Sequence, residues 1–464
     1  MNGFLNFLQT VGAFVVTLGV LVTIHELGHY WVARWCNVKV LRFSVGFGKP
    51  LRTWVRGADR TEWVLAAVPL GGYVKMLDER EGPVAPAELA RAFNTQSVWK
   101  RIAIVLAGPA ANLGLAVLLY WGLFMHGVPG LRPVMGTPPA ATAAANAGIV
   151  ANDVILSVGE VAVSTWQDAR WELLKQAVRR DETPAVALHV LTDAGAKAER
   201  RLDLSKLTKA DLDIDFLKML GVERHRLQAP PEVARIHAGS VAEAAGLKAG
   251  DEFVSIDNVA VKSVEQAIDT IVRNPDKPLM LEVRRAGGDR MEHVQITPRA
   301  LADKDGKVIG RLGADLRPVQ RMLDKYRTVV SYGPVDALGQ ALAKTWDLSI
   351  FSLRMLGKMI VGDVSLKNLS GPITIADYAG QSAQLGWISF LVFLALVSIS
   401  LGVLNLLPIP LLDGGHLLYY IVEVFKGSPV PEKVMEMGQR VGIAVLLVMM
   451  AFALFNDINR LISG

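Results

Sequence analysis

The sequence predicts a polytopic α-helical membrane protein with about four transmembrane helices, a membrane-associated β-hairpin region and a pair of repeated domains. Hydrophobic residues make up 51% of the 464 residues, which is high for a soluble enzyme. Four stretches lack Asp, Glu, Lys and Arg and are apolar enough to span a bilayer or nearly so. The chain between the second and third stretches repeats one pattern.

The four apolar stretches are Phe4–Ile24, Ile102–Gly127, Tyr378–Leu412 and Val441–Asn456. No Lys or Arg precedes Arg34, and no Ala-x-Ala site follows the first stretch, so we interpret it as a transmembrane helix rather than a signal peptide. The predicted transmembrane helices occupy residues 1–33, 102–127, 378–415 and 437–460.

The segment between the first two helices, residues 34–101, is basic. It contains 12 Lys and Arg against 6 Asp and Glu. Basic loops beside membrane spans face the cytoplasm, so both termini and the repeated domains should lie on the outer side, the periplasm of a bacterial inner membrane. No stripe of Arg with interleaved aromatic residues is present, and we expect no binding to nucleic acid.

The repeat has a period of 98 residues. "AGIVANDVILSVGEVAV" (147–163) aligns without a gap with "AGLKAGDEFVSIDNVAV" (245–261). The pattern resembles bacterial PDZ domains, and we assign two of them to residues 128–220 and 221–318. PDZ domains bind extended chain ends by strand addition. Neither copy contains a Gly-Leu-Gly-Phe loop, so a peptide binder and a spacer or size filter remain equal alternatives.

An amphipathic segment is predicted at residues 333–377. Within it, Lys344, Asp347, Arg354 and Lys358 share one helical face, opposite a mainly apolar face. Such a helix is typical of a membrane surface, although packing inside the protein explains the pattern equally well.

The motif "HELGH" stands at the end of the first apolar helix. His25 and His29 are four residues apart and so lie on one helical face, which suits a zinc ion. Glu26 is placed to act as general acid and base. Asp413, in "NLLPIPLLDGGHLLYY", is the best candidate for a third ligand. His416, three residues on, is the alternative third ligand; we favour a supporting or structural role for it.

Asn112 lies among the small residues Ala107, Ala110, Ala111 and Gly114 of the second helix. A buried asparagine there either joins helices through hydrogen bonds or braces the active site.

Together these motifs resemble the site-2 protease family of intramembrane zinc endopeptidases over nearly the whole chain. "FSVGFGKPL" and "VPLGGYVKMLDER" add to the likeness. The resemblance implies Zn²⁺ held by His25, His29 and Asp413, with Glu26 as catalytic acid and base. It also implies single-span membrane substrates, such as an anti-sigma factor or a remnant signal peptide, and an upstream site-1-type protease.

Residues 42–51 and 60–76 are predicted to form β-hairpins, in which Gly46 and Gly48 permit close backbone approach. They match the family's re-entrant β-loop, and an edge strand there could pair with an extended substrate. An ordinary cytoplasmic sheet is the alternative.

Asn405 is a candidate for binding the substrate backbone; some relatives carry a second Asn where this chain has Ser400.

Two other classes of function compete with this hypothesis. A catalytically silent PDZ membrane scaffold would not need HExxH together with a distant Asp-Gly-Gly. A transporter would need polar residues through several spans, and the second and fourth show almost none.

Overall fold

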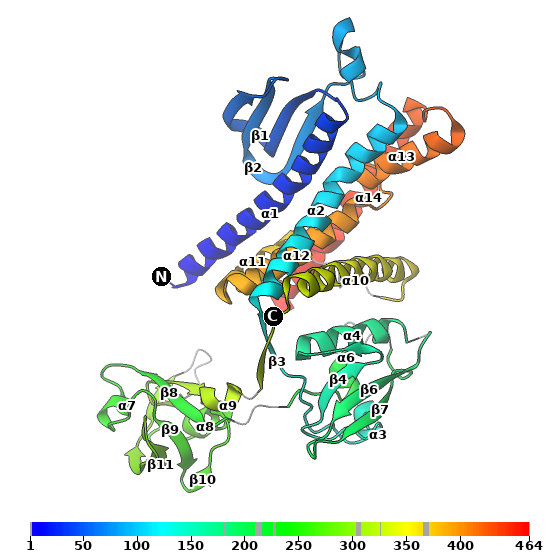
Figure 1. Cartoon of the computed structure of the whole chain (residues 1–464). Helices are drawn as coiled ribbons and strands as arrows, with labels where there is room; N and C mark the ends of the chain where they lie inside the picture. Colours follow the sequence, from blue (N-terminus) through cyan, green and yellow to red (C-terminus); the bar gives the residue numbers. More distant parts are fainter. Residues whose placement is uncertain are drawn as a thin grey trace. The chain divides into compact units, whose positions relative to one another are not determined.

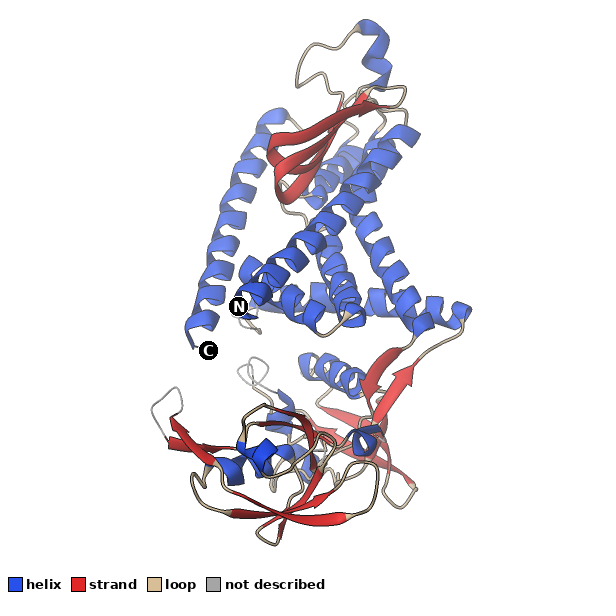
Figure 2. Ribbon diagram, turned by 90° about the vertical axis from the view of Figure 1, so that its left-hand side faces the viewer, coloured by secondary structure: helices blue, strands red, loops and turns tan. Residues whose placement is uncertain are grey.

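The computed structural model describes residues 2–180, 182–208, 216–225, 229–302, 308–324, 326–364 and 371–463. The chain forms two compact units. The first contains most of residues 1–128 and 330–464, and the second most of residues 129–329. The first unit is mainly helical and the second is mainly built from strands (Figure 2).

Four of the described helices contain segments long and apolar enough to cross a membrane. They are α1 (Asn2–Trp35), α2 (Val98–His126), α12 (Trp387–Asn405) and α14 (Glu432–Ser463). In α2, Pro109 lies inside the helix, where it follows Gly108 and faces α12. Gly402 of α12 lets these two helices pack closely, since a Cβ atom there would lie 3.1 Å from the carbonyl oxygen of Pro109.

The segment 378–415, predicted as one transmembrane helix, is divided among three helices. Helix α11 (Pro372–Gln384) ends before Gly386, whose φ of 112° breaks the helical path. Helix α12 ends at Asn405, and the prolines that follow prevent its continuation. Asp413 therefore begins a separate helix, α13 (Asp413–Lys426).

The basic segment forms one sheet from β1 (Val40–Arg56) and β2 (Thr61–Met76) beside the carboxy-terminal half of α1 (Figure 1). It is not two separate hairpins, because each strand bends and the halves interleave. Residues 42–45 pair with residues 72–75 on one side and with 62–65 on the other. Residues 52–56 pair with 61–65. Residues 72–76 therefore form an edge of this sheet.

Aromatic packing holds the sheet against α1. Tyr30 meets Phe43 and Trp63 edge-on, with ring centroids 5.9 and 5.1 Å apart. Phe43 is 2% exposed and belongs to the hydrophobic cluster that joins the helix to the sheet. Burying aromatic side chains is among the largest stabilising contributions per residue, so this contact fixes the sheet next to the HELGH motif.

The predicted amphipathic segment contains α10 (Pro334–Val361), which packs on α2 and α12. The indole nitrogen of Trp121 donates a hydrogen bond to the carbonyl oxygen of Pro334, 2.9 Å away. Leu342, Trp346 and Leu353 of the apolar face remain exposed in the protein. Residues 365–370 of the predicted segment lie outside the described residues.

In the second unit, both copies of the sequence repeat show the same order of elements. In each copy a short helix, a strand pair, a longer helix and two further strands follow one another. The elements of the first copy are α3 (Ala143–Asn146), β4 (Val154–Val158), β5 (Val161–Ala162), α4 (Trp166–Val178), β6 (Ala185–Leu191) and β7 (Lys197–Asp203). Those of the second are α7 (Val241–Ala244), β9 (Glu252–Ile256), β10 (Val259–Ala260), α8 (Val264–Val272), β11 (Leu279–Arg284) and β12 (Met291–Ile296).

The turn before the first long strand is also built alike in the two copies. Asp153 and Asp251 are both fully buried, and each accepts a hydrogen bond from the backbone N–H three residues earlier. Gly250 precedes the second aspartate at a φ of 90°, and Asn152 takes the matching place at 69°. Asparagine tolerates this left-handed conformation better than most residues, so the first copy keeps the turn without glycine.

The remaining strands either extend the sheet of the second copy or form two separate two-stranded sheets. They are β3 (Val128–Leu131), β8 (Pro231–Ile236), β13 (Arg299–Ala302), β14 (Val308–Arg311), β15 (Ala314–Pro318) and β16 (Arg327–Val330). The second copy forms a sheet in the order β12-β11-β9-β8-β15, around a core that includes Phe253, Leu281 and Val283.

Candidate metal centre and active site

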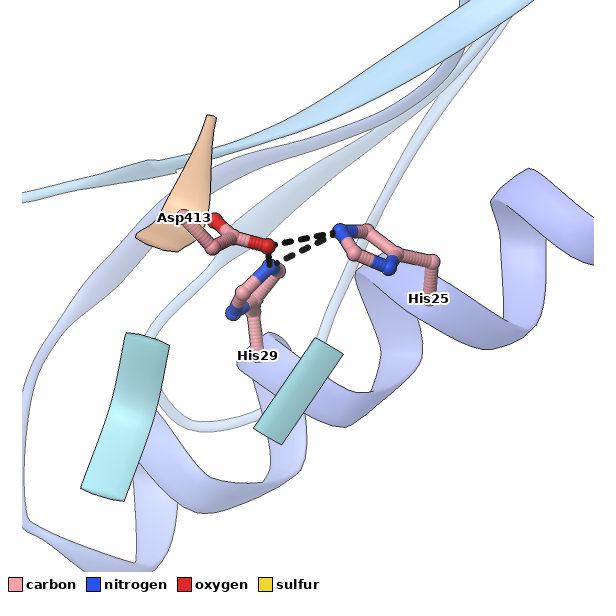
Figure 3. Close-up of side chains that lie close together, drawn as sticks. All are labelled: His25, His29 and Asp413. Carbon is pink, nitrogen blue, oxygen red and sulfur yellow. Dashed lines mark hydrogen bonds and ion pairs between the residues drawn. The ribbon is translucent and has the colours of Figure 1, made fainter. Parts of the chain in front are cut away.

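Three predicted ligands converge in the first unit (Figure 3). The Oδ2 atom of Asp413 lies 3.1 Å from Nε2 of His25 and 3.4 Å from Nε2 of His29. The two Nε2 atoms are 3.2 Å apart. Bonds of about 2.0–2.2 Å in a tetrahedral zinc site place ligand atoms about 3.3–3.6 Å from one another. The triangle therefore fits one zinc ion.

The chemistry of the three side chains also fits a metal. Both histidines are buried, and Asp413 Oδ2 is a buried acceptor without a hydrogen-bond partner among the described residues. Two neutral imidazoles and one carboxylate leave a fourth position open, as catalytic zinc sites require.

Residues of helix α2 hold both histidines through their Nδ1 atoms. Nδ1 of His29 lies 2.8 Å from the carbonyl oxygen of Ile104, to which it donates a hydrogen bond. This fixes the tautomer that leaves Nε2 free as a ligand. Nδ1 of His25 lies 3.2 Å from the side-chain amide of Asn112.

The amide of Asn112 is best oriented with its oxygen toward His25. Asn112 is fully buried, and its Oδ1 has no partner when the nitrogen faces the imidazole. Because Nε2 of His25 faces the metal position, Nδ1 carries the proton and must donate. Exchange of the two amide atoms lets Oδ1 accept this hydrogen bond, and such an exchange fits the same side-chain shape. Of the two roles weighed for Asn112, the geometry favours bracing the site.

Two glycines let α1 and α2 approach this closely. A Cβ atom on Gly28 would come within 2.3 Å of the carbonyl oxygen of Ala107. One on Gly108 would come within 2.3 Å of Nε2 of His29 and 2.8 Å of Cε1 of His25. Any side chain at residue 108 would occupy the space of the imidazoles.

Glu26 lies between the histidines in the sequence and faces the edge of the sheet. The edge residue Val74 of β2 lines the same cavity as Glu26. Gly72 packs against Glu26, since a Cβ atom there would lie 3.1 Å from Cγ of Glu26. The sheet edge and the candidate general base thus share one wall of the site.

A cavity of about 1050 Å³ contains the site. Its lining includes the three candidate ligands, Glu26, Asn405, His416 and the edge strand from Gly71 to Met76. His416 lies in the cavity but is not one of the three residues whose donor atoms converge.

Gly46 and Gly48, proposed from the sequence as substrate-binding residues, are not in the described lining of this cavity. They lie at the bend of β1, with φ values of 93° and 86°. Their freedom at positive φ allows the strand to turn between its two pairing partners. Gly71 and Gly72 line the cavity in their place, and the sequence signal for them is the pair of glycines in "VPLGGYVKM".

The sequence is similar to a family model and to curated proteins along almost its full length. The model "Peptidase family M50" matches residues 13–449. "Regulator of sigma-E protease RseP" of Escherichia coli (strain K12) is 42% identical over 98% of this chain and 100% of its own. "Regulator of sigma E protease" of Salmonella typhi has the same identity and coverage. A "putative zinc metalloprotease" of Ralstonia nicotianae is 44% identical over 97% of this chain and 98% of its own.

The chain belongs to peptidase family M50.

Among solved structures, the PDZ domains of SdrC-like proteins from Listeria innocua and Listeria monocytogenes are similar to a small part of this chain. They are 23% and 26% identical, cover 19% and 20% of this chain and 96% and 93% of their own, and each has a TM-score of 0.17.

Proposed function

We propose that this chain is an intramembrane zinc endopeptidase that cleaves single-span membrane proteins. The observation that carries the proposal is the convergence of His25, His29 and Asp413 in a cavity that also contains Glu26. Membership of a peptidase family and relatives named as zinc metalloproteases support the same reaction.

His25, His29 and Asp413 would hold the ion. When bound, zinc supplies Lewis acidity, which activates water and polarises a peptide carbonyl group. Glu26 takes the proton from the attacking water and later passes it to the nitrogen of the leaving amine.

The edge strand of β2 supports a substrate-binding role. A transmembrane helix hides its peptide bonds in its own hydrogen bonds and must unwind before cleavage. The freed backbone groups need new partners, and residues 72–76 form a sheet edge beside Glu26. An unwound segment that adds to this edge would present a peptide bond to the metal position. The glycines at residues 46 and 48 contribute by shaping the sheet.

Asn405, the last residue of α12, also lines the cavity. Its amide can donate to a substrate carbonyl oxygen or accept from a substrate N–H. In this role it holds the unwound segment within the cavity. Ser400 donates to the carbonyl oxygen of Leu396 within its own helix and takes no part in this contact.

We further propose a multi-pass protein of a bacterial inner membrane, with both termini and the repeated domains in the periplasm. The basic segment that contains β1 and β2 then faces the cytoplasm, which places the site near that face. By likeness to the relatives named for regulation of sigma-E, an anti-sigma factor trimmed by an upstream site-1-type protease is the expected substrate type. Remnant signal peptides are a second type.

The repeated domains are proposed as two tandem PDZ domains. Their matching element order and their buried Asp153 and Asp251 support two copies of one domain. They would screen substrates by the size of the outer segment or bind its trimmed end.

Metal analysis of the purified chain, paired with cleavage of a detergent-solubilised transmembrane peptide, tests the proposal. We expect about one zinc ion per chain in the wild type and in Glu26→Gln, because Glu26 is not a ligand. Only the wild type should cleave the peptide. His25→Ala should lose both zinc and cleavage. A Glu26→Gln protein that still cleaves at the wild-type rate would overturn the assignment of the general base.

A further inference from the structure

Asp413 reaches the two histidines from a helix of its own. Its carboxylate must be held within a few tenths of an ångström for metal binding, although α13 is separated from α12 by an irregular segment. At the start of α13, Gly414 and Gly415 pack against the carbonyl oxygens of Leu407 and Ile409. This packing fixes only one end of the helix.

The other end of α13 is tied to α2 by an ion pair. Arg101 donates from Nη1 to Oε2 of Glu423 over 3.1 Å and from Nη2 to Oε1 over 2.5 Å. Glu423 lies about 15 Å along the helix axis from Asp413, at 1.5 Å per residue. Two parallel hydrogen bonds fix the direction of the side chain as well as its distance. Among the residues that the structure describes, no other ion pair joins α13 to another helix, apart from those of Asp413.

This ion pair is largely shielded from solvent. The side chains of Arg101 and Glu423 are 12% and 14% exposed. The Arg101 guanidinium lies 4.8 Å from the ring centroid of Tyr420, which is itself buried. Its Nε donates to the carbonyl oxygen of Gln96, so the side chain is held at three points. A shielded, bidentate ion pair is a stronger constraint than a surface one.

The same stretch of α2 serves the histidine half of the site. Ile104, three residues after Arg101, accepts the hydrogen bond from His29. Asn112 and Gly108, farther along, position His25 and make room for both imidazoles. Helix α2 therefore contacts the histidines directly and reaches the helix of Asp413 through Arg101.

We propose that Arg101 and Glu423 are positioning residues for the metal centre: their ion pair holds α13 at the distance and rotation at which Asp413 completes the ligand set. The inference rests on the proposed function, because it assumes that zinc is the occupant. Neither residue touches the metal position, and their effect passes through α13.

Zinc affinity of the purified full chain in detergent, measured by competition with a chromophoric chelator, tests this role. We expect Arg101→Gln and Glu423→Gln to bind zinc about 10- to 100-fold more weakly, the usual effect of removing a residue that supports a ligand. The double variant Arg101→Glu with Glu423→Arg should recover most of the affinity. Lys100→Gln, with the same charge change at an exposed neighbour, should bind as the wild type does.

Cleavage at two zinc concentrations separates positioning from general damage to the fold. At limiting zinc the variants of the pair should cleave slowly, and at saturating zinc they should approach the wild-type rate, because Glu26 and the ligands are intact. If Arg101→Gln does not fold, Arg101→Lys decides, since it keeps the charge but loses the paired hydrogen bonds.

Wild-type zinc affinity in folded Arg101→Gln and Glu423→Gln would overturn the inference and leave the proposed function intact. A lower melting temperature with unchanged affinity would do the same, since it would show a purely structural role. A wild type that binds no zinc would overturn the proposed function and this inference together.

Discussion

Gly108 of α2 and His29 of α1 are in contact, so that a Cβ atom on Gly108 would lie 2.3 Å from Nε2 of His29. We therefore expect Gly108→Ala to displace both imidazoles and to weaken zinc binding by about 10- to 100-fold, the cost of forcing an extra methyl group into a packed site. Isothermal titration of the metal-free protein with zinc checks this.

Gly114→Ala is the matched control for this substitution. Gly114 lies on the same helix, and a Cβ atom there would have no neighbour within 4 Å. Equal zinc affinities for the two alanine variants would contradict the packing that the structure shows around residue 108.

The orientation of the Asn112 amide can be tested by two substitutions. Asn112→Leu removes the acceptor for Nδ1–H of His25 and should weaken zinc binding about 10- to 100-fold. Asn112→Asp keeps an acceptor and should retain most of the affinity. Ser398→Ala serves as control, because Ser398 donates to the backbone carbonyl of Asn112 and not to its amide. Loss of zinc in Asn112→Asp as large as in Asn112→Leu would show that the amide donates to His25.

Asn405 should affect cleavage without affecting the metal. In Asn405→Leu the cavity keeps its three ligands and Glu26 but loses the amide that faces the substrate. We expect cleavage to fall by about 10-fold or more, as when one hydrogen bond to the reacting segment is removed. Zinc content should not change.

Ser400→Ala is the companion variant for Asn405, since its hydroxyl group is bonded within α12. It should cleave at nearly the wild-type rate. If Ser400→Ala lost as much activity as Asn405→Leu, the assignment of substrate contact to Asn405 alone would fail.

Asp457 makes a separate contribution to stability. This nearly fully buried residue of α14 accepts hydrogen bonds from the backbone N–H groups of Gly371, Ile373 and Thr374, which open helix α11. Asp457→Ala would leave these donors without partners. We expect it to lower the free energy of unfolding by about 1–2 kcal/mol, the usual value of a strong helix cap.

Thermal unfolding in detergent measures the effect of Asp457→Ala, and Asp377→Ala provides the comparison. Asp377 is exposed on α11 and contacts Gln381 of the same helix. An equal melting temperature for Asp457→Ala and the wild type would contradict the capping role.

The three candidate ligands could be picked out from the sequence because their signals are local or strongly patterned, and the structure brings their donor atoms together. His25 and His29 are one helical turn apart, and Asp413 is a lone acidic residue after a long apolar run. The family likeness is confirmed by the match over residues 13–449. Four long apolar helices are also found, near the positions expected from hydropathy.

Tertiary relationships could not be predicted in the same way. The interleaved register of β1 and β2 depends on which half of each strand pairs with which. The contact of Gly108 with the histidines joins residues about 80 positions apart. In the sequence alone, Gly108 looks like an ordinary small residue of a membrane helix. The break between α12 and α13 was signalled by Pro408 and Pro410, but apolar composition alone favoured one continuous span.

The most direct test of the central claim is cleavage of a single-span reporter in cells. The reporter carries a shortened outer segment and a tag at each end, and it is co-expressed with the wild-type chain or with Glu26→Gln. The account predicts a cytoplasmic fragment with the wild type only, and a new terminus, located by mass spectrometry, inside the membrane span. The same fragment with both chains, or a terminus outside the span, would contradict it.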